Sequence, residues 1–201
     1  MVLAVVCLGC STGDGRQLAD PDPDLTRVTT TAPTATGEAA RGGPASALAI
    51  PVSSVGPGGL AVSSAAFAPG EPIPVEHTCD GADVAPAITW AHDGDEPLAL
   101  VVRDADAAGS VHWLATGLRG DTGTVNGSDG GAGTRHPNSF GVDGWSGPCP
   151  ADDLEHRYVF TMYALPPSLQ LPTAGGPDAI VAAIEDAQQG AATLVGVYGG
   201  P

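Results

Sequence analysis

The chain has 201 residues, which is enough for one ordinary domain and a tail. It carries 23 acidic and 7 basic residues, every basic one an arginine, and its formal net charge is -16. A chain this acidic repels phosphate backbones and anionic headgroups at long range. We therefore expect no nucleic-acid partner and no peripheral binding to anionic lipid headgroups.

The first ten residues resemble a bacterial lipoprotein signal. Val2 to Gly9 is apolar but much shorter than the roughly 20 residues that span a bilayer, and Cys10 follows it. In such signals the cysteine becomes the lipid-bearing first residue of the mature protein. We expect residues 1–10 to be a signal segment, Cys10 to be lipidated, and the exported protein to be anchored at the outer face of the cell membrane. The alternative is an uncleaved apolar terminus.

Residues 11–59 are rich in Pro, Thr, Ala and Gly and have no sustained apolar period. Such a segment cannot bury enough apolar surface to offset the entropy of ordering it. It is predicted to be a disordered tether, which acts as a passive spacer. As a flexible coil its ends would lie about 40 Å apart, enough to hold a domain clear of a membrane.

Residues 60–201 have the short apolar or alternating runs of a β-rich domain, bounded by Gly, Pro, Asp or Asn. This pattern predicts a sandwich or a barrel. One helix is expected over 177–189, where Pro177 suits the first turn and Gly190 follows the end. Repeated glycines predict a long surface loop over 121–133. The expected strands are 87–90, 98–102, 112–117, 158–165 and 193–198.

Several motifs follow one another in this domain. In chain order they are Thr78-Cys79-Asp80-Gly81, Asp104-Ala105-Asp106, Val111-His112-Trp113, Asn138-Ser139-Phe140-Gly141, Gly147-Pro148-Cys149-Pro150 and His156-Arg157-Tyr158. Each is common by chance, but the order and spacing together resemble the phosphatidylethanolamine-binding protein family in its bacterial Raf-kinase-inhibitor-like branch. The resemblance implies a mainly β fold, a Greek-key β-sandwich with a few peripheral helices, one of them near the C-terminus.

The resemblance also implies a small anion pocket. Two imidazoles can donate hydrogen bonds to a phosphate or carboxylate, and a nearby aspartate raises the imidazole pKa and keeps the ring cationic. Arg157 is expected to face away from the ligand and to pair with an aspartate. The residues carried over as ligand-binding are Asp104, Asp106, His112, Gly147, Pro148, Pro150, His156 and Tyr158.

The chain departs from the family pattern at three positions near this pocket. Ala105 and Ala108 replace the two prolines of the family's Asp-Pro-Asp-x-Pro motif, which removes their restraint on φ and predicts a more mobile loop. Leu154 replaces the glycine of the Gly-x-His-Arg-Tyr motif. Glu155, at the variable position, is predicted to repel a phosphate if its carboxylate faces the pocket.

The remaining polar and aromatic residues have structural interpretations. Asp80 and Asp83 are expected to cap turns by bonding nearby backbone amides. Core aromatics are expected at Trp90, Trp113 and Phe160, and solvated loop histidines at His77, His92 and His136.

Cys79 and Cys149 are the only cysteines in the predicted domain. In an exported protein the simplest interpretation of such a pair is a disulfide, and the alternative is two reduced thiols. The spacing does not indicate a cysteine-rich zinc site.

Three functions remain open. The first is a non-enzymatic binding module for a small anionic ligand, such as a phospholipid headgroup, or for a partner protein, with no cofactor. The second is a metal-dependent hydrolase that uses the His/Asp cluster. Against it, the sequence contains no His-Glu-x-x-His, no Gly-x-Ser-x-Gly and no assignable nucleophile. The third is a structural or inhibitory envelope protein with a vestigial pocket.

Overall fold

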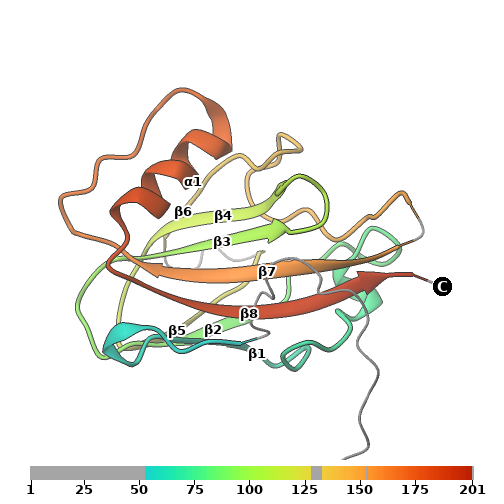
Figure 1. The fold of residues 1–201 in the computed structure, drawn as a ribbon, viewed down its shortest axis with the longest axis horizontal. Helices are drawn as coiled ribbons and strands as arrows, with labels where there is room; N and C mark the ends of the chain where they lie inside the picture. Colours follow the sequence, from blue (N-terminus) through green and yellow to red (C-terminus); the bar gives the residue numbers. More distant parts are fainter. Residues whose placement is uncertain (1–52, 128–132, 153, 201) are drawn as a thin grey trace, which may run out of the picture. The chain divides into compact units, whose positions relative to one another are not determined.

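The computed structural model describes residues 53–127, 133–152 and 154–200 (Figure 1). A large antiparallel sheet has the strand order β6-β4-β3-β7-β8, and a small antiparallel sheet has the order β1-β2-β5. The elements are η1 (Pro57–Gly59), β1 (Ala61–Ser64), η2 (Val75–His77), β2 (Ile88–Ala91), β3 (Leu98–Asp104), β4 (Val111–Leu118), β5 (Thr122–Val125), β6 (Thr134–Arg135), β7 (Glu155–Ala164), α1 (Gly176–Ala187) and β8 (Gly190–Gly199).

The main apolar core lies between the two sheets. β2 alternates buried and exposed residues, as a strand does when only one face of its sheet is covered, and it turns Ile88 and Trp90 inward. They pack with Trp113 and Phe160 of the large sheet in one cluster. The predicted core aromatics are thus confirmed, because all three have relative exposures of 2% or less.

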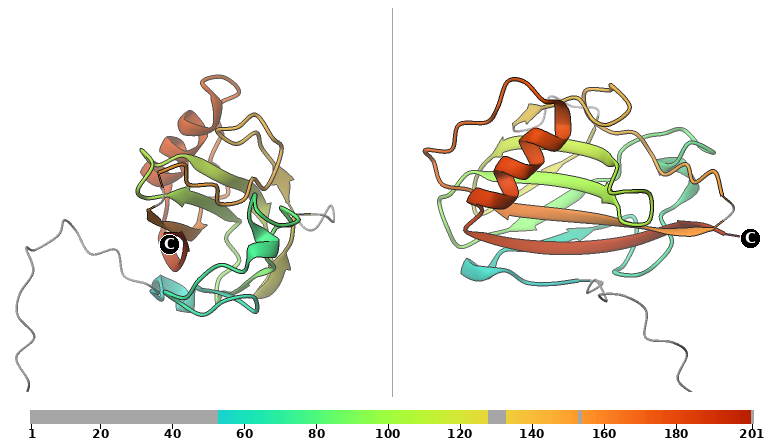
Figure 2. Two further views of the ribbon diagram at one scale, coloured as in Figure 1. Left: turned by 90° about the vertical axis from the view of Figure 1, so that its right-hand side faces the viewer. Right: turned by 45° about the horizontal axis from the view of Figure 1, so that its top comes forward.

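The opposite face of the large sheet is covered by α1, as Figure 2 shows. Ile180, Val181 and Ile184 form one stripe of the helix and pack against Val101 and Leu114. Because both faces of the large sheet are covered, β3 is buried at six of its seven positions. The predicted helix near the C-terminus is confirmed, with its bounds shifted by one or two residues.

Each of the five predicted strands overlaps a strand of the structure, and the mainly β sandwich is confirmed. The pairing of β3 with β7, which are far apart in the chain, is consistent with the predicted Greek-key connection. Ser53 and Ser54 already contact β8, ahead of the predicted domain start at Leu60. The signal segment, with Cys10, and the tether as far as residue 52 lie outside the described residues.

The predicted surface loop over 121–133 is wrong in its first part, because β5 occupies Thr122–Val125. Gly123 is the register partner of Trp90, and a Cβ added to Gly123 would lie 2.1 Å from an indole carbon. The glycine is therefore there to let the indole pack on the strand. Glycine content alone suggested a loop because the sequence does not show which side chain lies above it.

Candidate functional site

Three strand ends meet at one end of the large sheet. β3 ends at Asp104, and its antiparallel neighbours β4 and β7 begin beside it at Val111 and Glu155. The register pairs Asp104 with Tyr158, and cross-strand partners project from the same face of a sheet. His156 precedes Tyr158 by two residues and therefore shares that face.

A cavity of about 580 Å³ opens at this end of the sheet. Among the predicted ligand residues, those that line it are Asp104, His112, Gly147, Pro150, His156 and Tyr158. The prediction did not include Asp83, Phe140, Ser146 and Asp152, which also line it. The cavity thus brings together most of the predicted set and adds a second group of carboxylates.

Asp104 is buried and organises the β3–β4 turn as well as the cavity. One of its carboxylate oxygens, Oδ1, accepts hydrogen bonds from the backbone N–H groups of Asp106 and Ala107 at 2.8 and 3.0 Å. The other, Oδ2, lies 2.8 Å from Nδ1 of His156. Because its carboxylate is held from three directions, Asp104 fixes the plane of the His156 ring.

His156 lies between two carboxylates. Its Nε2 is 3.0 Å from Oδ1 and 3.2 Å from Oδ2 of Asp152, on the side opposite Asp104. The hydrogen bond to Asp104, followed by that to Asp152, raises the pKa of His156 above its usual value, although burial opposes the rise. Both ring nitrogens face carboxylate oxygens, which can only accept hydrogen bonds, so this geometry favours the doubly protonated, cationic imidazole, and both nitrogens are already used.

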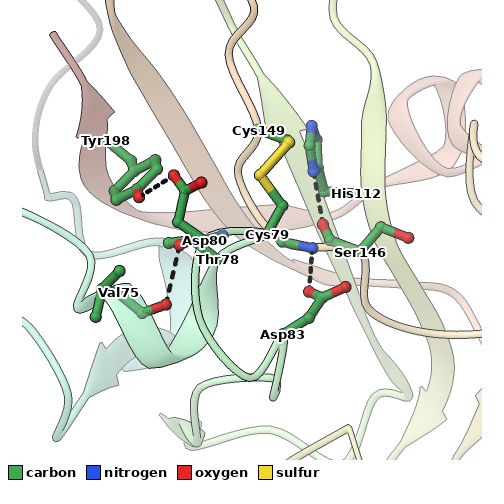
Figure 3. The surroundings of a disulfide bond; sticks show 10 residues. Val75, Thr78, Cys79, Asp80, Asp83, His112, Ser146, Cys149 and Tyr198 are labelled. Atoms are coloured by element: carbon green, nitrogen blue, oxygen red, sulfur yellow. Dashed lines mark hydrogen bonds between the residues drawn. A yellow bond between two sulfur atoms is a disulfide. The ribbon is translucent and has the colours of Figure 1, made fainter.

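His112 has the opposite character. Its Nδ1 donates to the Ser146 carbonyl oxygen at 2.7 Å (Figure 3), and its ring makes edge contacts with Phe140 and Tyr158. Burial lowers the pKa of His112, so the ring is neutral near pH 7. With the proton on Nδ1, the remaining nitrogen, Nε2, is a hydrogen-bond acceptor.

Tyr158 supplies a hydroxyl to the same wall. The residue is fully buried, and within the described part of the chain its hydroxyl oxygen has no hydrogen-bond partner. Burial raises the pKa of Tyr158, and the negative charge of Asp104 adds to the rise, so the group stays a protonated donor. A buried donor without a partner is uncommon, and a ligand acceptor atom would satisfy it.

The Cys79–Cys149 disulfide joins two walls of the cavity (Figure 3). Next to it, Asp83 accepts a hydrogen bond from the Gly147 N–H at 2.7 Å. A Cβ at Gly147 would lie 2.6 Å from both that carboxylate and the His77 carbonyl oxygen, so only glycine fits. The predicted disulfide is present and holds the two segments in register.

A model of the phosphatidylethanolamine-binding protein family matches residues 63–199. The chain belongs to this family. A Mycobacterium tuberculosis protein named "Putative lipoprotein LppC" is 38% identical over 207 residues, an alignment that covers all of this chain and 93% of that protein. The Mycobacterium bovis UPF0098 protein Mb1945c is 41% identical over 145 residues, with 70% of this chain and 71% of the relative covered.

The family fold is also seen in a solved structure. The crystal structure of YbcL from E. coli, described as a member of the mammalian phosphatidylethanolamine-binding protein family, superposes with a TM-score of 0.62 and 22% identity. The match covers 70% of this chain and 98% of YbcL. It establishes the shared fold, and the family model over residues 63–199 confirms the family inferred from the motifs.

Two predicted ligand residues of the family pattern lie away from the cavity lining. Asp106 makes a two-pronged ion pair with Arg157, at 3.0 Å to Nε and 2.7 Å to Nη2, and this pair lowers the pKa of Asp106. Pro148 is buried, and its carbonyl oxygen accepts the Cys79 N–H at 3.1 Å. Their places therefore fit structural roles, and the prediction that Arg157 pairs with an aspartate is confirmed.

The β3–β4 turn differs from the family pattern in its backbone. Ala108, where the family has proline, adopts a φ of 55°. Proline cannot reach this left-handed conformation, because its ring holds φ near -65°. The turn is tied by Asp104 and by Ser110, whose hydroxyl donates to the Ala107 carbonyl oxygen at 2.9 Å.

The carboxylate that lies close to the cavity histidine is Asp152, whereas Glu155 was considered from the sequence. Glu155 is exposed and lines a separate cavity that also borders Pro150, whereas Asp152 reaches His156. Adjacent strand residues point to opposite faces, so Glu155 cannot share the face of His156. Asp152 precedes the strand and returns to the ring through the loop. Only its separation of four residues from His156 hinted at this contact.

Other polar predictions were wrong. His77 and His92 are buried rather than solvated, and His92 lies 3.0 Å from Glu96. Asp80 accepts a hydrogen bond from the Tyr198 hydroxyl instead of capping a turn, and Asp83 bonds the distant Gly147. The two aspartate contacts join segments far apart in the chain, which local turn rules do not consider.

Two further observations concern membranes and metals. No helix in the described ranges is long and apolar enough to cross a bilayer. In the same residues, no group of three or more His, Cys, Asp or Glu side chains is arranged to hold a metal ion.

Proposed function

We propose that this domain is a non-enzymatic binding module that takes a small ligand with an oxyanion group into the cavity between His112 and His156. The observation that carries the proposal is the convergence of a cationic imidazole, a neutral imidazole and an unpartnered tyrosine hydroxyl on one cavity. Tyr158 can donate to an oxyanion as it stands, His156 can donate from Nε2 when Asp152 moves aside, and His112 becomes a donor when it takes up a proton. The set therefore suits a phosphate group, whether free or on a lipid headgroup.

Among the described residues that line the cavity, no nucleophile is activated by a base. Ser110 and Ser146 are the serines that line it within the described residues, and neither hydroxyl is bonded to a histidine ring. Ser110 donates to a backbone carbonyl, and the Ser146 oxygen accepts from the Asn138 amide at 2.8 Å. The two lining cysteines are joined in the disulfide. This arrangement favours binding over covalent catalysis.

The neutral state of His112 gives the proposed function a defined pH dependence. An anion beside the ring stabilises the imidazolium, so binding should take up a proton and raise the pKa of His112 from its lowered value. Affinity should be highest below the pKa of the free protein and should fall as pH rises through the pKa of the complex.

Calorimetric titration with sulfate tests this, because sulfate does not titrate between pH 5 and 8 and any pH dependence then belongs to the protein. We expect His112→Ala and His156→Ala each to weaken binding by about tenfold or more, as for loss of a charge-assisted hydrogen bond. His136→Ala, outside the cavity, is the matched control and should leave binding unchanged. Unchanged sulfate binding in both His112→Ala and His156→Ala would contradict the proposal and favour the structural or inhibitory role.

The proposal includes an anchor at the outer face of the cell membrane through a lipid on Cys10. It is supported by the apolar run that ends at this cysteine and by the lipoprotein name of a relative aligned over the whole chain. The proposal also allows for a partner protein that binds at the rim of the cavity. Phe140, Val142 and Leu154 are exposed apolar side chains on nearby loops and suit such a contact.

A further inference from the structure

We propose that Asp152 is a specificity-determining residue that occupies the oxyanion position of the cavity in the free protein and excludes monocarboxylates. This inference rests on the proposed function, since it concerns which anions the same cavity accepts. It adds a residue that is absent from the family motifs matched in this sequence.

The two carboxylates on His156 are held very differently. The Asp104 side chain is 4% exposed and also accepts two backbone N–H groups, so it cannot leave without breaking the turn. The Asp152 side chain is 52% exposed, and among the described residues other than His156 it accepts only a long backbone hydrogen bond from Leu154, at 3.3 Å. Asp104 is thus a permanent partner, and Asp152 is a displaceable one.

Asp152 occupies the hydrogen bond that a ligand needs. Nδ1 of His156 is committed to Asp104, so Nε2 is the only nitrogen of this ring that can donate to a ligand. Both oxygens of Asp152 lie within 3.2 Å of that nitrogen. A ligand oxygen can reach Nε2 only when the Asp152 carboxylate moves away. Because the Asp152 side chain is half exposed, water can solvate the displaced carboxylate.

This competition discriminates among anions. A free monocarboxylate such as acetate makes the same contact as Asp152, but the tethered group acts at a millimolar or higher effective concentration. Replacing the Asp152 carboxylate by acetate therefore yields no net binding free energy. A tetrahedral dianion has more oxygens and more charge, so it can contact His156 and the Tyr158 hydroxyl together, which Asp152 is not seen to do. The cavity should consequently prefer sulfate or phosphate over carboxylates.

The charges of the residues that line the cavity also support a role for Asp152 in limiting anion binding. Asp83, Asp104 and Asp152 line the cavity together with one cationic imidazole, so the free cavity carries an excess of negative charge. Removing Asp152 removes a competitor and a repulsive charge at once. An anion should bind more tightly to the variant that lacks it.

The experiment compares Asp152→Ala and Asp152→Asn with the wild-type protein by calorimetric titration with sulfate and with acetate. Glu155→Gln is the matched control, because it removes one negative charge nearby from a residue that does not line this cavity. We expect sulfate to bind Asp152→Ala about three- to tenfold more tightly, as for release of a half-exposed ion pair together with its repulsion. The affinity for acetate should increase by a larger factor, and the affinities of Glu155→Gln for both anions should stay within about twofold of the wild type.

NMR titration of His156 checks the contact without a ligand. Loss of the Asp152 hydrogen bond should lower the pKa of His156, while Asp104 keeps it above the usual value. Sulfate and acetate affinities unchanged by Asp152→Ala, in a protein whose sulfate binding still needs both cavity histidines, would overturn this inference and leave the proposed function standing. No anion binding by any of the proteins would overturn both.

Discussion

Reduction of the Cys79–Cys149 disulfide should destabilise the domain by about 4 kcal/mol. The bond spans a sequence separation of 70, and the chain-entropy relation for a loop of that size gives about 15 cal/mol/K, or about 4.4 kcal/mol at 25 °C. For a domain of roughly 150 residues each kcal/mol moves Tm by about 2–4 °C, so Tm should fall by about 9–18 °C.

Thermal unfolding followed by circular dichroism measures the effect. Both cysteines are exposed, so a reductant can reach the bond in the folded protein. The double variant Cys79→Ala/Cys149→Ala should melt where the reduced wild type melts and should not respond to reductant, while its β spectrum is retained. An unchanged Tm in wild-type protein whose thiols are shown to be free would refute the entropic reasoning. Two free thiols in the unfolded, non-reduced protein would show that the bond is absent.

The disulfide should matter for binding as well as for stability. It joins the segment that carries Asp83 to the segment that carries Gly147, and both line the cavity. The reduced protein should therefore bind sulfate more weakly at a temperature where it is still folded. Equal affinity of the two forms would mean that the Asp83 hydrogen bond alone holds the walls in place.

Three further changes have defined outcomes. His156→Ala leaves the buried Asp104 carboxylate without its imidazole and should cost about 1–3 kcal/mol in denaturant unfolding, and a neutral result would mean that water replaces the ring. Ala108→Gly should stabilise by about 0.5–1 kcal/mol because glycine adopts positive φ freely, whereas Ala108→Pro, which restores the family residue, should destabilise by about 1 kcal/mol or more; the reverse order would refute the assigned backbone. Cys10→Ser should move the protein from the membrane fraction to the soluble fraction with its fold intact, and equal membrane association would count against lipid anchoring.

Local patterns in the sequence were sufficient for the family and the main elements. Apolar runs of β type, bounded by turn residues, placed the strands at 98–102 and 158–165, because burial and alternation act residue by residue along a strand. Pro177 and the stripe of Ile180 and Ile184 marked the helix for the same reason. The ordered motifs then identified the β-sandwich, and with it the prediction that His112 and His156 lie at one site.

Tertiary contacts decided what the site can do. His112 and His156 are the same residue type with opposite protonation, since one is desolvated by Phe140 and Tyr158 and the other is held between two carboxylates. A pKa depends on burial and on neighbouring charges, and these come from segments far apart in the chain.

The carboxylates were separated by the same long-range geometry. Asp104 faces the cavity and Asp106 faces Arg157, although only one residue lies between them, because the turn after β3 changes the direction of the chain. Asp152 reaches the cationic imidazole because the loop before β7 turns its side chain toward the ring. Glu155 is nearer in the chain but points away, because side chains alternate between the two faces of a strand. The sequence by itself determined the fold and the two histidines of the site, and only the folded chain decided which carboxylate lies where a ligand would bind.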